Sequence, residues 1–243
     1  ISNGDMATKV GADTAAIGYV SLTTNFAANN LHPVSYEGVE PTMDNVLDGT
    51  YLLKRPFSYV TRAAGDFESQ AKEDLVAAFI DYMVNSIEGR EIIFAAGGIV
   101  DVDAGTPWDE LKVNHPIVNQ DNSSMTLYTG GSTSVQRTLQ AAIESFVPLA
   151  GNFQINMSHT GSSDGFRRVL GGEKDGANRA DIGFASRAFN DSEDVSPAME
   201  SGIYCFDAVV VVTNIANSSV TNLSKDQIAA IFKGEITRWE DLN

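Results

Sequence analysis

Two stretches decide the fold class of this chain: MTLYTGGSTSVQRTL at residues 125–139 and FQINMSHTGSSDGFRRVL at residues 153–170. Each begins with a strand-like run, passes through a turn rich in glycine and serine, and continues into a helical run. Alternating strands and helices predict a parallel-type α/β sheet, in which ligands bind at the carboxyl ends of the strands. Both serine turns are therefore expected to face one crevice.

The two turns have the chemistry of an oxyanion site. They are Gly130-Gly131-Ser132-Thr133-Ser134 and Gly161-Ser162-Ser163-Asp164-Gly165. Backbone N–H groups in the first turn of a helix, the positive end of its dipole and short hydroxyl side chains converge on one point, and glycine lets the backbone approach closely. Such a site needs neither a metal nor a basic side chain. Because the same residue types also cap helices, simple capping is the alternative interpretation.

An enzymatic interpretation is weaker. The second turn satisfies the G-x-S-x-G pattern of a hydrolase nucleophile elbow, in which the catalytic histidine follows the serine. Here His32, His115 and His159 all precede Ser163, so a serine hydrolase is disfavoured and no enzyme is predicted. P-loop, GxGxxG, HExxH and paired CxxC motifs are absent, which gives no support to a cofactor or metal site. Arg167-Arg168 either adds charge to the anion site or forms surface salt bridges.

Composition is typical of a globular protein with one large or two small domains: 243 residues, 43% apolar and 20% charged. A formal net charge of −16 disfavours nucleic acid and anionic lipid as partners, because these bind clustered lysine and arginine. A small anion remains possible, since surface charge is screened within about 10 Å at 0.1 M salt. No signal peptide is visible, as in a mature or a cytosolic chain. The single Cys205 is expected to be buried.

The remaining elements follow from periodicity and turn signals. Pro56 lies in an extended run, which is placed at a sheet edge or at a crossing between lobes. Residues 97–123 are rich in glycine, proline and polar residues, and are predicted to be a connector. Strands are expected at 16–22, 51–61, 181–185 and 208–212, and helices at 44–47 (closed by Gly49), 68–84 and 225–232 (with a Ser224/Gln227 capping box).

Several of these stretches resemble the periplasmic-type phosphate-binding proteins that supply the ABC phosphate importer. The resemblance covers nearly the whole chain. It implies a two-lobed α/β fold of the type II periplasmic-binding-protein kind. It also implies capture of inorganic phosphate outside the cell, with or without a lipid anchor, and hand-over to a membrane ABC permease, without catalysis or cofactor. Residues 129–135, 161–169, 180–187, 208–214 and 223–239 resemble the first half of the family, and residues 16–22, 38–42 and 51–57 resemble the second half.

The two halves stand in reversed order relative to the family. A circular permutant and a slice through a tandem array both fit, and the slice is slightly favoured because Ile1 begins within an expected helix. Either way the second lobe would be incomplete, lacking an arginine and a Gly-Ser-Gly-Thr type loop, and exchange of lobes with a second chain is one way to complete a site. A scaffold or sensor that keeps the fold is the alternative function. The expected domains are residues 1–57 (part of the smaller lobe), 58–96 (hinge return and helix of the larger lobe), 97–123 (connector) and 124–243 (main sheet of the larger lobe).

The resemblance also implies a ligand set. Many family members follow the serine of the third strand with an aspartate, which accepts the proton of hydrogen phosphate and rejects sulfate. Here Ser186 is followed by Arg187, which is expected to bind either dianion bidentately. Asp164 is the candidate replacement acceptor. The expected phosphate-binding residues are Ser132, Thr133, Ser134, Ser162, Ser163, Asp164, Ser186 and Arg187.

Overall fold

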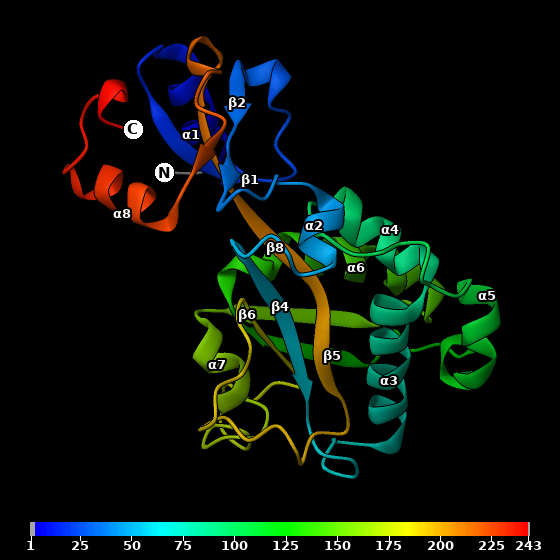
Figure 1. Ribbon diagram of the computed structural model, residues 1–243. Helices are drawn as coiled ribbons and strands as arrows, with labels where there is room; N and C mark the ends of the chain where they lie inside the picture. The colour runs from blue at the N-terminus through cyan, green and yellow to red at the C-terminus, as the bar shows by residue number, and fades with distance from the viewer. Residues whose placement is uncertain (1–2, 243) are drawn as a thin grey trace. The chain divides into compact units, whose positions relative to one another are not determined.

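The computed structural model describes residues 3–242, which divide into two compact units (Figure 1). The larger unit is Arg55–Phe206, and the smaller unit combines the chain up to Lys54 with the chain from Asp207 onward. The first division lies close to the predicted boundary at residue 57. Residues 207–243, however, group with the N-terminal segment, whereas the sequence analysis placed them in the larger lobe. The reason is that the end of the long strand β8 (Ser201–Asn214) pairs with N-terminal strands.

The sheet of the larger unit has a parallel centre, as predicted. Strand β5 (Thr126–Gly131) lies between β6 (Gln154–His159) and β7 (Ile182–Ala185) and runs parallel to both. The strand order is β8-β4-β7-β5-β6, with β4 (Lys54–Thr61) antiparallel to β7. The run with Pro56 is therefore inside the strand order and not at an edge.

Pro56 is tolerated within β4 because of the register. The pairing of β4 with β7 begins at Ser58, opposite Ala185, which is two residues beyond the proline. Proline lacks the N–H that a sheet ladder needs, so its place before the paired segment leaves this ladder intact. Pro56 also lies just after the division between the two units, close to the predicted crossing.

Three helices carry the apolar core of the larger unit: α3 (Gln70–Asn85), α4 (Ile87–Ala95) and α6 (Gln136–Phe146). Helix α3 confirms the predicted helix at residues 68–84, and its cap Ser69 accepts a hydrogen bond from the Lys72 amide. Tyr82 is central, with its ring 5.0 Å from Phe146 and 5.3 Å from Trp108. Figure 1 shows α3 and α4 gathered on one side of this unit and the short helix α7 (Ser162–Arg167) on the opposite side.

The predicted connector at residues 97–123 is a packed part of the larger unit. It contains α5 (Trp108–Leu111) and two 3-10 turns, Lys112–Asn114 and Pro116–Asn119. Trp108, Ile117 and Val118 are buried in the core. Several of the glycines and prolines that suggested a linker instead mark helix ends: Gly97, with φ +97°, follows the end of α4, Pro107 precedes α5, and Pro116 begins the second 3-10 turn. Cys205 is buried, as predicted.

The smaller unit is built around the valine-rich end of β8. Strands β1 (Ile17–Ser21) and β2 (Leu31–Pro33) pair antiparallel with it, and α1 (Asn3–Ala12) covers the resulting apolar cluster. The predicted capping box at α8 (Lys225–Lys233) is confirmed, and Thr42 caps α2 (Met43–Leu47). A short parallel pair joins β3 (Ser35–Tyr36) to β9 (Asn222–Leu223). Among the described residues, every helix is too short or too polar to cross a bilayer.

Candidate functional site

The first serine turn is shaped by a glycine at the end of β5. Gly131 has φ +124°, and a Cβ at this position would lie 1.9 Å from the carbonyl oxygen of Phe184 on β7. Only glycine permits both the dihedral and the close approach. The next amide, of Ser132, donates to that same Phe184 carbonyl at 2.9 Å. The pairing of β5 with β7 therefore continues one residue into the turn and fixes the place of Ser132.

Two amides hold the second turn against the first. Those of Thr160 and Gly161, just after β6, both donate to the carbonyl oxygen of Gly131 at 2.8 Å. Helix α7 then begins at Ser162, so the amides of its first turn lie where an α-helix leaves N–H groups without an intrahelical partner. Ser162 is half-buried and Ser163 is exposed.

Three serine hydroxyls from three neighbouring strand ends meet at this point. The Ser132 hydroxyl donates to the Ser186 hydroxyl at 2.9 Å, and the Ser162 and Ser186 oxygens lie 3.3 Å apart. The Ser186 amide also donates to the Ser162 hydroxyl oxygen at 3.1 Å. We call Ser132, Ser162 and Ser186 the serine cluster. Because a hydroxyl hydrogen rotates freely, each member can turn its O–H from its neighbour toward a bound oxygen atom.

His159 supports the first turn through both ring nitrogens. Its Nδ1 lies 2.9 Å from the Ser132 carbonyl oxygen, and its Nε2 lies 3.1 Å from the Thr129 hydroxyl. A carbonyl only accepts, so Nδ1 carries the hydrogen in this pair and Nε2 accepts from Thr129. Burial lowers the pKa of His159, which favours the neutral ring. In the part of the chain that the structure describes, no histidine hydrogen-bonds to the Ser163 hydroxyl, so the geometry of a hydrolase is not assembled.

The arginine pair of the second turn forms salt bridges. Arg168 is 7% exposed and donates to the Ser158 carbonyl at 2.6 Å and the Thr160 hydroxyl at 2.9 Å. Arg167 bonds to Asp164 at 3.2 Å, and Thr160 donates to the other Asp164 oxygen. Both carboxylate oxygens of Asp164 therefore have partners within its own turn and helix. The role of Asp164 as a proton acceptor for phosphate stays a prediction.

Arg187 does not present the open fork that the sequence suggested. Its two terminal nitrogens bind Glu193 bidentately, at 2.6 and 2.9 Å, and Nη2 also donates to the Ser163 hydroxyl at 3.3 Å. The hydrogen bond to Arg187 lowers the pKa of Glu193, and the same bond raises the pKa of Arg187. Glu193 thus occupies the end-on face of the guanidinium in this conformation, and bidentate binding of a dianion by Arg187 stays a prediction.

The structure thus brings most of the predicted ligand set together within the larger unit. Ser132, Ser162 and Ser186 are directly hydrogen-bonded, and Arg187 reaches Ser163. The Ser134 amide donates to the Ser132 hydroxyl oxygen at 3.2 Å. Thr133 is exposed in the 3-10 turn between Ser132 and α6. Sequence reasoning misses Glu193, because nothing in the sequence distinguishes it from its acidic neighbours Asp191 and Asp194.

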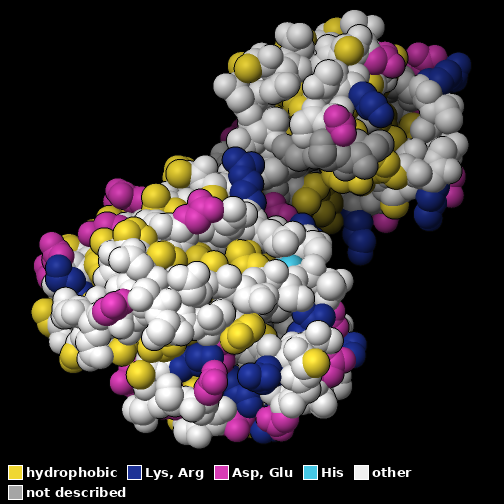
Figure 2. Space-filling model, turned by 180° about the vertical axis from the view of Figure 1, so that it is seen from behind, with side chains coloured by type: hydrophobic (Ala, Val, Ile, Leu, Met, Phe, Trp, Pro, Cys, Tyr) yellow, Lys and Arg dark blue, Asp and Glu magenta, His cyan; other side chains and the backbone are white. Residues whose placement is uncertain are grey.

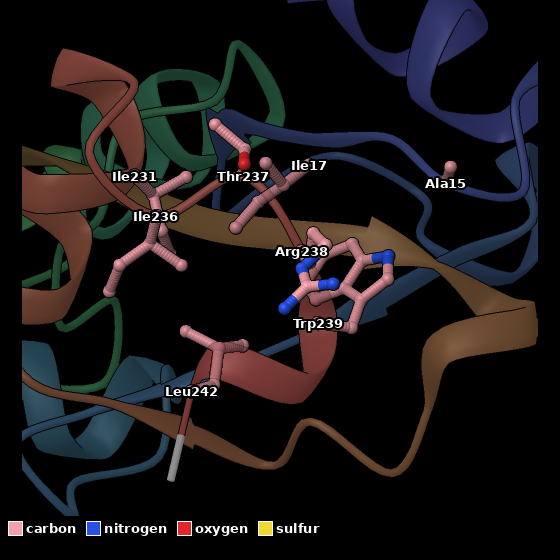
Figure 3. Close-up of a pocket in the computed structure, with 8 residues that line it drawn as sticks. All are labelled: Ala15, Ile17, Ile231, Ile236, Thr237, Arg238, Trp239 and Leu242. Atoms are coloured by element: carbon pink, nitrogen blue, oxygen red, sulfur yellow. The ribbon is translucent and has the colours of Figure 1, made fainter.

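Two of the other hollows have linings unlike the serine cluster. In the smaller unit, a cavity of about 170 Å³ has a largely apolar lining, and its one charged side chain, Arg238, is paired with Glu240 and Asp241 (Figure 3). In the larger unit, a cavity of about 340 Å³ near the start of β7 is lined by charged groups of both signs, among which Lys72 pairs with Glu68 and Asp181 and Arg62 pairs with Asp66. Figure 2 likewise shows basic and acidic side chains interspersed on the face in view.

Comparison with known proteins shows the family to which this fold belongs. Residues 117–243 match the model of the PBP superfamily domain. The chain belongs to the PBP superfamily. The PBP fold accounts for the two units and the parallel sheet, and the resemblance seen in the sequence is confirmed.

Relatives of this PBP superfamily chain match it over most or all of its length. "Phosphate-binding protein PstS 2" of Streptococcus agalactiae is 29% identical over 242 residues, which cover 100% of this chain and 73% of that protein. The protein of the same name from Streptococcus pneumoniae serotype 4 is 27% identical over 227 residues, 93% of this chain and 68% of its own. The crystal structure of a phosphate ABC transporter, phosphate-binding protein from S. pneumoniae TIGR4 superposes with a TM-score of 0.80 at 26% identity, covering 100% of this chain and 83% of that one. The reversed order of halves and the incomplete lobe stay predictions.

Proposed function

We propose that this chain captures inorganic phosphate outside the cytoplasm and delivers it to a membrane ABC permease, without chemical conversion. The observation that carries the proposal is the serine cluster, in which hydroxyls from the ends of β5, β7 and the β6–α7 turn meet within hydrogen-bond distance. The names of the relatives, phosphate-binding proteins and a phosphate ABC transporter component, supply the ligand and the transport role.

The proposed binding mechanism relies on uncharged hydroxyl and amide donors together with one paired arginine. Phosphate oxygens would accept hydrogen bonds from the serine cluster, from Arg187 and from amides at the start of α7, where the positive end of the helix dipole also favours an anion. Hydrogen bonds to a charged partner contribute about 1.5–3 kcal/mol each. Directed hydroxyls favour an oxyanion over a halide, because a tetrahedral oxyanion presents several acceptor oxygens and a halide ion presents a single acceptor atom.

Site geometry is compatible with the strongly acidic chain. The formal net charge of −16 acts over the whole surface, where salt screens it within about 10 Å at 0.1 M. The donors act over hydrogen-bond distance, and Ser132 is only 3% exposed. The local donors therefore outweigh the surface charge, and we expect phosphate affinity to depend on the serine cluster.

Calorimetric titration of the full chain, freed of carried-over phosphate, tests the proposal. We expect the unsubstituted protein to bind phosphate, and Ser162→Ala and Ser186→Ala each to weaken binding about 10- to 100-fold, the loss of one hydrogen bond to a charged ligand. The matched control is Ser124→Ala, an exposed serine just before the other end of β5, which should bind as the unsubstituted chain does. Folded protein that gives no heat with millimolar phosphate, or equal affinity in Ser162→Ala, would contradict the proposed site.

A further inference from the structure

An ion pair lies directly beside the serine cluster. Arg187 follows the cluster member Ser186 in the chain, and its Nη2 donates to the hydroxyl of Ser163 in the first turn of α7. Glu193, six residues further on, binds both terminal nitrogens of Arg187. The pair is therefore joined to the anion site by a covalent neighbour and by a hydrogen bond.

Glu193 is held more firmly than the arginine that it binds. Its side chain is 8% exposed, against 35% for Arg187. Its Oε2 accepts a second hydrogen bond from the Asn190 amide at 3.0 Å, so the backbone of the loop fixes the carboxylate. A buried carboxylate in a fixed place determines where the more exposed guanidinium rests.

The hydrogen bonds of Arg187 show which of its N–H donors remain available to a ligand. Guanidinium has five N–H donors. Two bind Glu193, one binds the Ala188 carbonyl at 3.0 Å and one rests on the Ser163 hydroxyl at 3.3 Å. Among the described residues, the Nε hydrogen has no hydrogen-bond partner, and the long bond to Ser163 is the weakest of the four. Glu193 therefore takes the end-on face of Arg187, formed by Nη1 and Nη2, while Nε and the second Nη2 hydrogen remain for the site.

Charge near the serine cluster is balanced in the same way. Arg167 pairs with Asp164 and Glu173, and Arg168 lies 3.6 Å from Asp164. With Arg187 and Glu193, three arginines face three carboxylates. Removing one carboxylate would leave a net positive charge within a few ångströms of the bound anion.

We propose that Glu193 is a positioning residue of the anion site: it cancels the charge of Arg187 and positions its Nη2 against Ser163, so that the anion is bound by donors without net charge. The proposal rests on the proposed function, since it concerns the same site. Glu193 acts through Arg187 and does not touch the ligand. The balance removes the local arginine charge from the salt dependence of binding, so what remains of that dependence comes from the acidic surface as a whole.

The test compares phosphate affinity in Glu193→Gln and in the unsubstituted full chain at about 0.01 M and about 1 M salt. Gln keeps an acceptor for the Asn190 amide but removes the negative charge. At low salt we expect Glu193→Gln to bind phosphate about tenfold more tightly, an advantage that falls to about twofold or less at high salt. Asp194→Asn is the matched control, because it removes the same charge from an exposed position on the same loop, and its affinity should change by less than about twofold.

A second variant guards against loss of folding in Glu193→Gln. Arg187→Gln leaves the Glu193 carboxylate uncompensated, so phosphate binding should weaken about tenfold at low salt and recover in part at high salt. Two results would show a merely structural pair and overturn the inference: a folded Glu193→Gln that binds phosphate equally or more weakly at both salt concentrations, or an Arg187→Gln whose loss of affinity does not depend on salt. If the unsubstituted chain still binds phosphate, the proposed function stands in either case. No phosphate binding by the unsubstituted chain would overturn both.

Discussion

Replacing Gly131 with alanine should both destabilise the larger unit and damage the proposed anion site. The residue has φ +124°, a region that L side chains rarely adopt, and the Cβ of an alanine there would lie 1.9 Å from the Phe184 carbonyl oxygen. Dihedral strain costs about 1–3 kcal/mol. Moving Phe184 away also breaks its hydrogen bond from the Ser132 amide, worth about 0.5–1.5 kcal/mol. The expected loss is about 2–4 kcal/mol.

Urea unfolding measures this loss if the signal comes from the larger unit alone. Trp108 is 4% exposed in that unit, whereas the second tryptophan, Trp239, lies in the smaller one. A Trp239→Phe background therefore makes tryptophan fluorescence report on the larger unit. The matched control is Gly172→Ala, because Gly172 has no atom within 4 Å of its Cβ position and no positive φ. The control should change stability by less than about 1 kcal/mol.

The same variant tests how the site is built. Phe184 lies two residues before Ser186, so a shift of β7 that accommodates the new methyl group also moves one member of the serine cluster. We expect phosphate affinity to fall by more than about 10-fold under conditions where Gly131→Ala is still folded. Stability within about 1 kcal/mol of the parent, together with unchanged affinity, would refute the view that this glycine sets the position of the first turn.

Two further predictions concern protonation and capping. Burial lowers the pKa of His159 below its ordinary value, so the unfolded chain takes up the proton more readily. The free energy of unfolding should therefore fall as the pH drops below about 6.5, with a slope from this residue of up to about 1.4 kcal/mol per pH unit. In urea unfolding measured over a pH series, His159→Gln should flatten this slope. An unchanged slope would contradict the role given to His159. In the smaller unit, Ser224→Ala removes the side-chain cap of α8 and should cost about 1 kcal/mol, followed through Trp239 in a Trp108→Phe background. Ser219→Ala, at an exposed turn position before β9, is the control, and an equal loss in both variants would contradict the capping role.

Local features of the fold were predictable because they depend on neighbours in the chain. The Ser224 cap of α8, the short helix α2 and the apolar stripe of α3 each require only residues within one or two turns. The ends of β5 and β6 were predictable for the same reason, since strand, glycine turn and helix follow one another directly. Their parallel pairing then brought the two serine turns together.

Features that depend on distant partners were not predictable. Pro56 suggested a strand at a sheet edge or at a crossing between lobes. Its place inside the strand order depends on the register that begins at Ser58, which is fixed by β7, far later in the chain. Residues 97–123 have the composition of a linker, yet Trp108 finds Tyr82 and Phe146 in the core. The pairing of Arg187 with Glu193 was not predictable, because Glu193 lies in an irregular loop without periodicity.

The arrangement of charge around the serine cluster would explain how an acidic chain can offer the proposed anion site. Each arginine near the cluster is paired: Arg167 and Arg168 with Asp164, and Arg187 with Glu193. Free arginines would attract any anion, with an energy that salt weakens, whereas paired arginines contribute direction without net charge. Discrimination then depends on where the hydroxyl donors stand, and that is fixed by Gly131 and by the continuation of β5–β7 pairing to Ser132. On this view selectivity for a tetrahedral oxyanion is a property of the sheet ends, and the ion pairs prevent the surrounding arginines from overriding it.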